Sequence, residues 1–233
     1  MKAALAIVCL AVAACAAASP LAALVAERPI VLLGEVHDNT AQHAERLAAL
    51  HALVERGARP ALLFEQFERE RQADIDRVRA ASGDADALIA AGSARKAGWN
   101  WESYKPFVAL ALRHDLPIVA ANVSRADARR IIDDGLAVHG FDAALPAGLL
   151  REQAAAVERG HCGLIDARAA RRLALAQIAR DQQMARLVAE HEEAGLRESA
   201  ARDVRAPDHQ FGGAIAAHGV EREDGRRAHG PGG

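Results

Sequence analysis

The segment Ile30–Asn39, which reads IVLLGEVHDN, decides the fold that this chain is expected to adopt. Four aliphatic residues run into Gly34, and a short apolar run that ends at a glycine predicts a buried β-strand. Glu35 and His37 follow directly after that glycine. In open α/β sheets, ligand sites lie just beyond the carboxyl ends of the strands. The segment therefore predicts both the sheet and the place of its chemistry.

Two further segments repeat this pattern of an apolar run followed by a polar residue. Ala61–Phe64 is a second buried run and leads into Glu65, and Leu116–Ala121 is a third and leads into Asn122. Segments with helical periodicity separate the runs. Strands that alternate with helices predict an α/β fold, here a three-layer α/β/α domain with a largely parallel or mixed central sheet.

The expected helices carry recognisable start signals. Asn39 is placed to cap a helix that runs to about Arg56, with Gln42 reaching back as in a capping box. Ser124 is placed to cap a short helix after the third strand. The longest helix is expected from Ala167 to about residue 194.

The composition narrows the class of protein. At 233 residues, the chain is long enough to bury a core and short enough for one domain. The formal net charge is −2, and no cluster of basic residues indicates nucleic-acid binding, so nucleic acid is not an expected partner.

The N-terminus predicts export. Residues 1–18 place Lys2 before an apolar run that is too short to span a bilayer, which needs about 20 residues, and fit a signal peptide. The sequence VAAC ending at Cys15 resembles a bacterial lipobox, so Cys15 is a candidate for lipidation. An ordinary signal peptide cleaved near Ala18 is the alternative. With residues 19–29 as a tether, we expect an exported, lipid-anchored protein that faces the periplasm.

The two ends of the chain therefore flank one expected domain, residues 30–200. Residues 201–233 are rich in Arg, Asp, Gly and His and show little apolar periodicity, and Ile215 is nearly their only large aliphatic residue. This composition predicts a disordered, atypical tail.

Parallel strands would bring the polar residues at their ends together. Glu35, His37, Glu65 and Asn122 are then expected to converge at one edge of the sheet. Such a set can hold a divalent metal, with His37 and Glu65 as ligands, or act as a general acid–base group with Glu35, His37 and Glu65 as catalytic candidates. A polar network that only satisfies strand ends is the third interpretation.

Two other groups of residues are candidates for a site. Both tryptophans and the only tyrosine, Tyr104, lie within residues 99–104, where they could stack on a flat ligand or pack in the core. The phenolate of Tyr104 is a possible ligand of haem iron. Arg180 and Asp181 fall on a buried stripe of the longest helix, where an ion pair would brace either the site or only the fold.

Several motifs together resemble the ChaN-like haem-binding lipoproteins. They appear in the family's order over about residues 30–188 and comprise Leu33-Gly34-Glu35-Val36-His37-Asp38-Asn39, Leu63-Phe64-Glu65-Gln66-Phe67, Trp99-x-Trp101-x-x-Tyr104, Ala121-Asn122-x-x-Arg125, His161-Cys162-Gly163 and Ala176-Gln177-x-x-Arg180-Asp181-x-x-Met184-Ala185.

This resemblance implies a fold related to the erythromycin-esterase and Tiki-type proteins, and haem binding in bacterial iron acquisition. It implies haem held between two subunits by a tyrosine, hence a possible homodimer, and Tyr104 is the only tyrosine available. Tiki-type relatives hold a divalent metal for hydrolysis, and Gly34, His37 and Glu65 match that usage. The family's final strand and Gly-Asn-Gly-His segment have no match in Asp203–Gly233, as a shifted reading frame or a truncation would produce, so a strand and a site histidine are expected to be missing.

The leading hypothesis is a membrane-anchored lipoprotein that binds haem or another small ligand and is not an enzyme. A metal-dependent hydrolase is the alternative, and a degenerate lipoprotein without a ligand is the third. The expected ligand-binding residues are Glu35, His37, Glu65, Tyr104, Asn122, Arg180 and Asp181.

Overall fold

The computed structural model describes residues 20–93, 98–203 and 214–219, the last of these and residues 194–203 as backbone only. In chain order the elements are α1 (Pro20–Ala26), β1 (Ile30–Glu35), α2 (Thr40–Glu55), β2 (Ala61–Glu68), η1 (Arg69–Arg71), α3 (Gln72–Ala80), α4 (Ala85–Gly92), α5 (Trp101–Arg113), β3 (Ile118–Asn122), α6 (Arg125–Asp134), η2 (Ala137–His139), α7 (Leu149–Gly160), α8 (Ala167–Asp203) and β4 (Ala214–Gly219).

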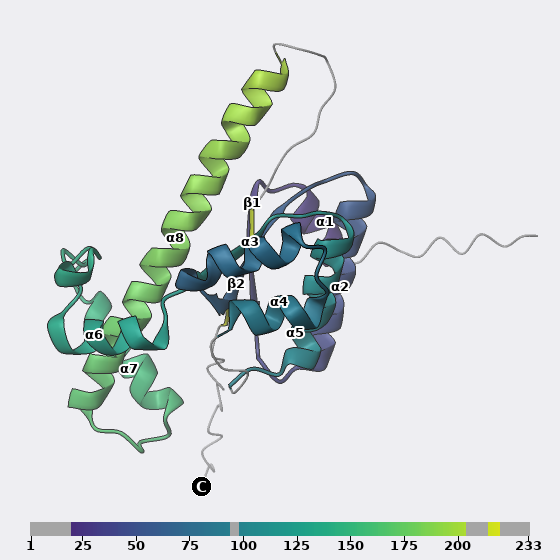
Figure 1. The fold of residues 1–233 in the computed structure, drawn as a ribbon. Helices are drawn as coiled ribbons and strands as arrows, with labels where there is room; N and C mark the ends of the chain where they lie inside the picture. The colour runs from purple at the N-terminus through teal and green to yellow at the C-terminus, as the bar shows by residue number, and fades with distance from the viewer. Residues whose placement is uncertain (1–19, 94–97, 204–213, 220–233) are drawn as a thin grey trace, which may run out of the picture.

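The described strands form a parallel sheet in the order β1-β4-β2-β3. Helices cover both of its faces. Leu33, Leu62 and Phe64 pack with α1 to α5 on one face, whereas Leu63 and Val119 pack against Met184 of α8 on the other. The prediction of an α/β fold with three layers is confirmed, and Figure 1 shows the sheet between α2, α4 and α5 on one side and α8 on the other.

The sheet contains a strand that the sequence analysis did not predict. β4 lies between β1 and β2, with Ile30 opposite Ala214 and Glu35 opposite Gly219. The prediction of a disordered tail, and of a missing strand, is therefore wrong for residues 214–219. A central strand obtains hydrogen bonds from two neighbours, so a short run of small apolar residues suffices where periodicity gives almost no signal. Residues 204–213 and 220–233 lie outside the described residues.

The folded domain also begins earlier than expected. Residues 20–26, assigned to a tether, form α1, which packs on α2. Val25 is 3% exposed and belongs to the same core as Leu33. The predicted signal peptide and Cys15 lie outside the described residues.

The helices after β3 form a second packed unit around the first half of α8. Ile131, Phe141 and Ile178 join α6, the segment after η2, and α8 in one apolar cluster, and α7 packs along α8. Figure 1 shows α6 and α7 beside one end of α8, on the side of the sheet opposite α1 and α2. α8 thus links this unit to the sheet, and at 37 residues it is about 55 Å long.

Candidate functional site

The first part of the site is built where β1 ends and α2 begins. Asn39 caps α2 as predicted, and its Oδ1 accepts the backbone N–H of Gln42 at 3.1 Å. The side chain of Gln42 reaches back to the N–H of Val36, at 2.8 Å, three residues before the cap. This pair of hydrogen bonds fixes the turn that holds His37, and it aims the first turns of α2 at the end of β1.

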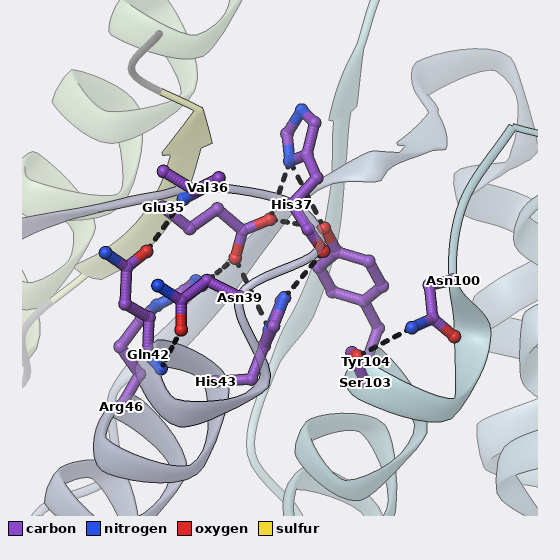
Figure 2. Close-up of polar contacts among 10 residues, drawn as sticks. All are labelled: Glu35, Val36, His37, Asn39, Gln42, His43, Arg46, Asn100, Ser103 and Tyr104. Carbon is purple, nitrogen blue, oxygen red and sulfur yellow. Dashed lines mark hydrogen bonds and ion pairs between the residues drawn. The ribbon is translucent and has the colours of Figure 1, made fainter. Parts of the chain in front are cut away.

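Glu35 is the centre of the site. Its side chain is 1% exposed, and both of its oxygens have partners. Oε1 accepts hydrogen bonds from the Tyr104 hydroxyl and from Nδ1 of His37, the latter at 2.9 Å, while Oε2 pairs with Arg46 and lies 3.5 Å from Nδ1 of His43. Figure 2 shows these four side chains gathered around the one carboxylate.

Arg46 supplies the positive charge that this buried carboxylate needs. Its side chain is 6% exposed and lies one turn from His43 on α2, with its guanidinium over the ring of Phe107 at 5.5 Å. Burial lowers the pKa of Arg46 to about 10, so it remains protonated at neutral pH and pairs with Glu35. A buried carboxylate without such a partner would cost several kcal/mol, roughly, in lost solvation.

Tyr104 comes from the first turn of α5, and with it a third element joins β1 and α2 in the site. It is 2% exposed, and the rings of His43, Trp99 and Trp101 surround it with centroids at 5.0, 5.7 and 6.3 Å. Burial raises the pKa of Tyr104 to about 12, with a smaller contribution from Glu65, while Arg46 and Gln66 oppose the rise. At neutral pH the phenol is therefore protonated and donates to Glu35.

His37 is the part of the site that faces solvent. Its side chain is 53% exposed although its neighbours are buried, and the edge of its ring meets Trp99 at 4.9 Å between centroids. The backbone oxygen of His37 accepts a hydrogen bond from Nε2 of His43, at 3.1 Å. Glu35 thus holds the imidazole at Nδ1, His43 holds the backbone of the same residue, and about half of the side chain faces solvent.

Glu65, Asn122, Arg180 and Asp181 form a second group near the ends of β2 and β3. Nδ2 of Asn122 donates to the backbone oxygen of Glu65 at 2.8 Å. Burial lowers the pKa of Arg180, while the carboxylates of Glu65 and Asp181 oppose this change. Gln177 connects Arg180 and Asp181, because its side chain accepts a hydrogen bond from Nη1 of Arg180 at 3.3 Å and donates one to Asp181 at 3.0 Å.

Of the four residues predicted to converge, the structure brings Glu35 and His37 into contact with each other, and Asn122 into contact with Glu65. Glu35, His37 and Tyr104 come together, whereas the Glu65 group gathers on the side of α8. Leu33 is level with Phe64 through Ala217, but the pairing of β2 with β3 shifts between Phe64 and Glu68, so strict alternation of side chains ends at Phe64. Gln66 lines a small cavity together with Arg46 and Tyr104.

Sequence reasoning missed His43, Arg46 and Gln66 as members of the site. His43 and Arg46 follow the cap residue Asn39 at positions that face back toward the strand end, and this spacing was the available signal. Among the residues whose side chains are described, no three His, Cys, Asp or Glu residues gather as a metal-binding group. The exposed loop at Cys162 lies between α7 and α8.

Comparison with known proteins agrees with this architecture. Residues 21–201 match the model of a family described as haem-binding uptake, Tiki superfamily, ChaN. A solved structure, described as cofacial heme binding to ChaN of Campylobacter jejuni, superposes with a TM-score of 0.63 at 17% identity and covers 85% of this chain and 73% of that one. The search of curated proteins found no match.

Proposed function

Because this chain belongs to the haem-binding uptake family of the Tiki superfamily, ChaN, we propose that it binds haem where β1 ends and α5 begins. The observation that carries the proposal is the half-exposed imidazole of His37, which a buried carboxylate holds at the end of a parallel strand. Ligands of α/β sheets bind at this end of the strands.

The residues present fit the chemistry of haem. Haem needs a side chain that can coordinate iron and an apolar surface for the macrocycle. His37 and Tyr104 are residue types that coordinate haem iron, and Trp99 lies partly exposed beside both. The redox and ligand-exchange chemistry would belong to the haem, while these side chains hold and orient it.

The alternative of a metal-dependent hydrolase has less support from this site. Glu35 is enclosed by Tyr104, Arg46 and two histidines, so a substrate cannot reach its carboxylate without displacing them. The side chains described offer no cluster of three metal-binding residues. We therefore propose a binding protein rather than an enzyme.

A haemin titration tests the proposal. The full chain is purified in detergent and titrated with haemin, and we expect a saturable Soret shift at a fixed haem-to-chain ratio. Trp99→Ala removes the aromatic surface beside His37 and should weaken binding more than Trp101→Ala, because the Trp101 indole stacks on Phe67 at 5.8 Å and contacts Tyr104, whereas the Trp99 indole contacts His37 directly. A spectrum that stays that of free haemin in wild-type protein would overturn the proposal.

We further propose that the protein is an exported lipoprotein in haem or iron uptake, anchored through Cys15 and facing the periplasm. None of the described helices combines the length and apolarity required to cross a bilayer. Cys15→Ser should move the protein from the membrane fraction to the soluble fraction after cell disruption, and an unchanged distribution would contradict the anchor. Light scattering with and without haemin tests whether haem is held between two copies.

A further inference from the structure

The two ring nitrogens of His37 have different environments. Nδ1 lies 2.9 Å from Oε1 of Glu35 and 3.4 Å from the Tyr104 hydroxyl, and Figure 2 shows the rest of the ring projecting away from both. Nε2 has no hydrogen-bond partner among the described residues. Since the buried carboxylate can only accept at this contact, the proton of the neutral ring belongs on Nδ1, which leaves a free lone pair on Nε2.

This arrangement is the one that metal-binding histidines use. A histidine that ligates a metal almost always donates its other N–H to a carboxylate or a carbonyl, which fixes the tautomer and makes the ligand nitrogen more basic. Glu35 provides that acceptor, and it is itself held by Arg46 and Tyr104. The ring of His37 is therefore oriented before any ligand arrives.

The other candidates near this point are less available. Tyr104 is 2% exposed, and its hydroxyl is directed at Glu35 rather than outward. His43 is 4% exposed, and its Nε2 donates to the backbone oxygen of His37. Either residue would have to leave its partners before it could coordinate an external iron atom.

We propose that Nε2 of His37 is the axial ligand of the haem iron and that Glu35 is the positioning residue that orients it. This inference rests on the proposed function and departs from the tyrosine ligand that the family resemblance implied. Tyr104 then acts through Glu35, because its hydroxyl donates to the same oxygen that accepts from His37.

Resonance Raman spectroscopy of the reduced, haem-loaded full chain tests the ligand, because an iron–histidine stretching band arises only when histidine is the axial ligand. We expect the band in wild type and in Tyr104→Phe, and its loss in His37→Ala together with about tenfold or more weaker haem binding. His51→Ala is the matched control, since His51 is 43% exposed and its Nδ1 lies 3.4 Å from a carboxylate oxygen of Glu55. Added imidazole should restore the histidine-type spectrum in His37→Gly.

The outcomes separate the two proposals. Wild-type protein that fails to bind haemin overturns the proposed function. Wild-type protein that binds haemin, with a spectrum unchanged in His37→Ala or abolished in Tyr104→Phe, overturns only the assignment of His37. Glu35→Gln should shift the iron–histidine band to lower frequency and weaken haem binding about 10- to 100-fold, while an unshifted band in that variant or in Glu35→Asp would exclude the positioning role.

Discussion

The hydroxyl of Tyr104 donates a hydrogen bond to Oε1 of Glu35, although 69 positions separate the two residues in the sequence. This contact links the start of α5 to the end of β1. The exposed His37 is hydrogen-bonded to the same carboxylate, so two segments that are distant in the sequence fix its position. Since Tyr104 is the only tyrosine in the chain, its ionisation can be followed without interference from other phenols.

The absorbance of tyrosinate should therefore report directly on this site. Burial raises the pKa of Tyr104 to about 12, from the value near 10 of an exposed phenol. We expect the folded protein to titrate with a midpoint of about 12, and the protein in denaturant with a midpoint near 10. The measurement is a pH titration of the difference absorbance, with circular dichroism to follow folding. A midpoint near 10 in protein that is still folded would contradict the buried contact.

The same pKa shift determines whether the unfolding free energy rises or falls with pH. A group whose pKa is higher in the folded state contributes stability below its unfolded pKa and loses it as the pH rises through the folded value. The difference in unfolding free energy between wild type and Tyr104→Phe should thus fall between about pH 10 and pH 12. Denaturant melts of both proteins across this range measure it, and a constant difference would be inconsistent with the shift.

Breaking the ion pair of Glu35 and Arg46 should be the most costly single change in the site. Both side chains are at most 6% exposed, so Glu35→Ala leaves a buried guanidinium without its partner. We expect the free energy of unfolding to fall by about 3–5 kcal/mol. The matched control is Glu55→Ala, because Glu55 is 62% exposed and should change stability by less than about 0.5 kcal/mol.

The double variant Glu35→Leu/Arg46→Met separates charge from packing. It removes both charges and keeps apolar volume, so it should recover much of the stability that Glu35→Ala loses. Chemical denaturation of the single and double variants gives the comparison. If Glu35→Ala and the double variant lose the same unfolding free energy, packing around Glu35, and not the unpaired charge of Arg46, accounts for the loss.

Much of the fold follows from local sequence, because β1 and the caps of α2 and α6 are short-range features. Asn39 and Ser124 cap their helices as predicted, with Ser124 Oγ accepting the N–H of Asp127 at 3.1 Å. The strand end also predicted Glu35 and His37 as site residues. Periodicity could not reveal β4, because a strand of six residues with small side chains depends on its two neighbours.

Which side chain of β2 lies beside Glu35 and Tyr104 required information that no local pattern contains. Adjacent residues of a strand point to opposite faces, so a shift of one residue in register decides which side chain joins the site. β2 is irregular after Phe64, where its pairing with β3 shifts, and Gln66 lines the cavity beside Arg46 and Tyr104. A local sequence pattern does not reveal such an irregularity, so it could not show which of Glu65 and Gln66 would lie beside Tyr104.

A second ion-pair group should give the protein a defined sensitivity to acid. Asp127 of α6 pairs with Arg69 of η1 at 2.9 Å and with Arg130. The pair with Arg69 links the segment after β2 to the unit that α6 and α7 form around the first half of α8. The contact with the Glu70 carboxyl, together with hydrogen bonds from Arg69 and Arg130, lowers the pKa of Asp127 to about 2 although burial opposes this, while the pKa of Glu70 is raised. Asp127→Asn should reduce the unfolding free energy at neutral pH by about 1–3 kcal/mol.

The pH dependence of that loss has a definite sign. A carboxylate with a lowered pKa contributes stability above its unfolded value, here 3.8, and loses it as the pH falls toward 2. The difference between wild type and Asp127→Asn should therefore shrink from pH 4 to pH 2, as urea melts at several pH values would measure. Asp76→Asn on α3 serves as the control, and a difference that persists at pH 2 would contradict the assignment.

The position of β4 predicts that the fold needs residues 214–219, although their composition predicted a disordered tail. In the described sheet, β1 pairs with β4 alone, so a chain that stops at Asp203 leaves β1 without hydrogen bonds to any strand. We expect this truncated chain to lose its cooperative thermal transition, since unpaired backbone groups in a buried sheet are costly. A chain that stops at Gly219 keeps the whole ladder and should melt within a few degrees of wild type. Circular dichroism melts of the two truncated chains decide the matter, because equal behaviour would mean that β4 does not hold β1 in the sheet.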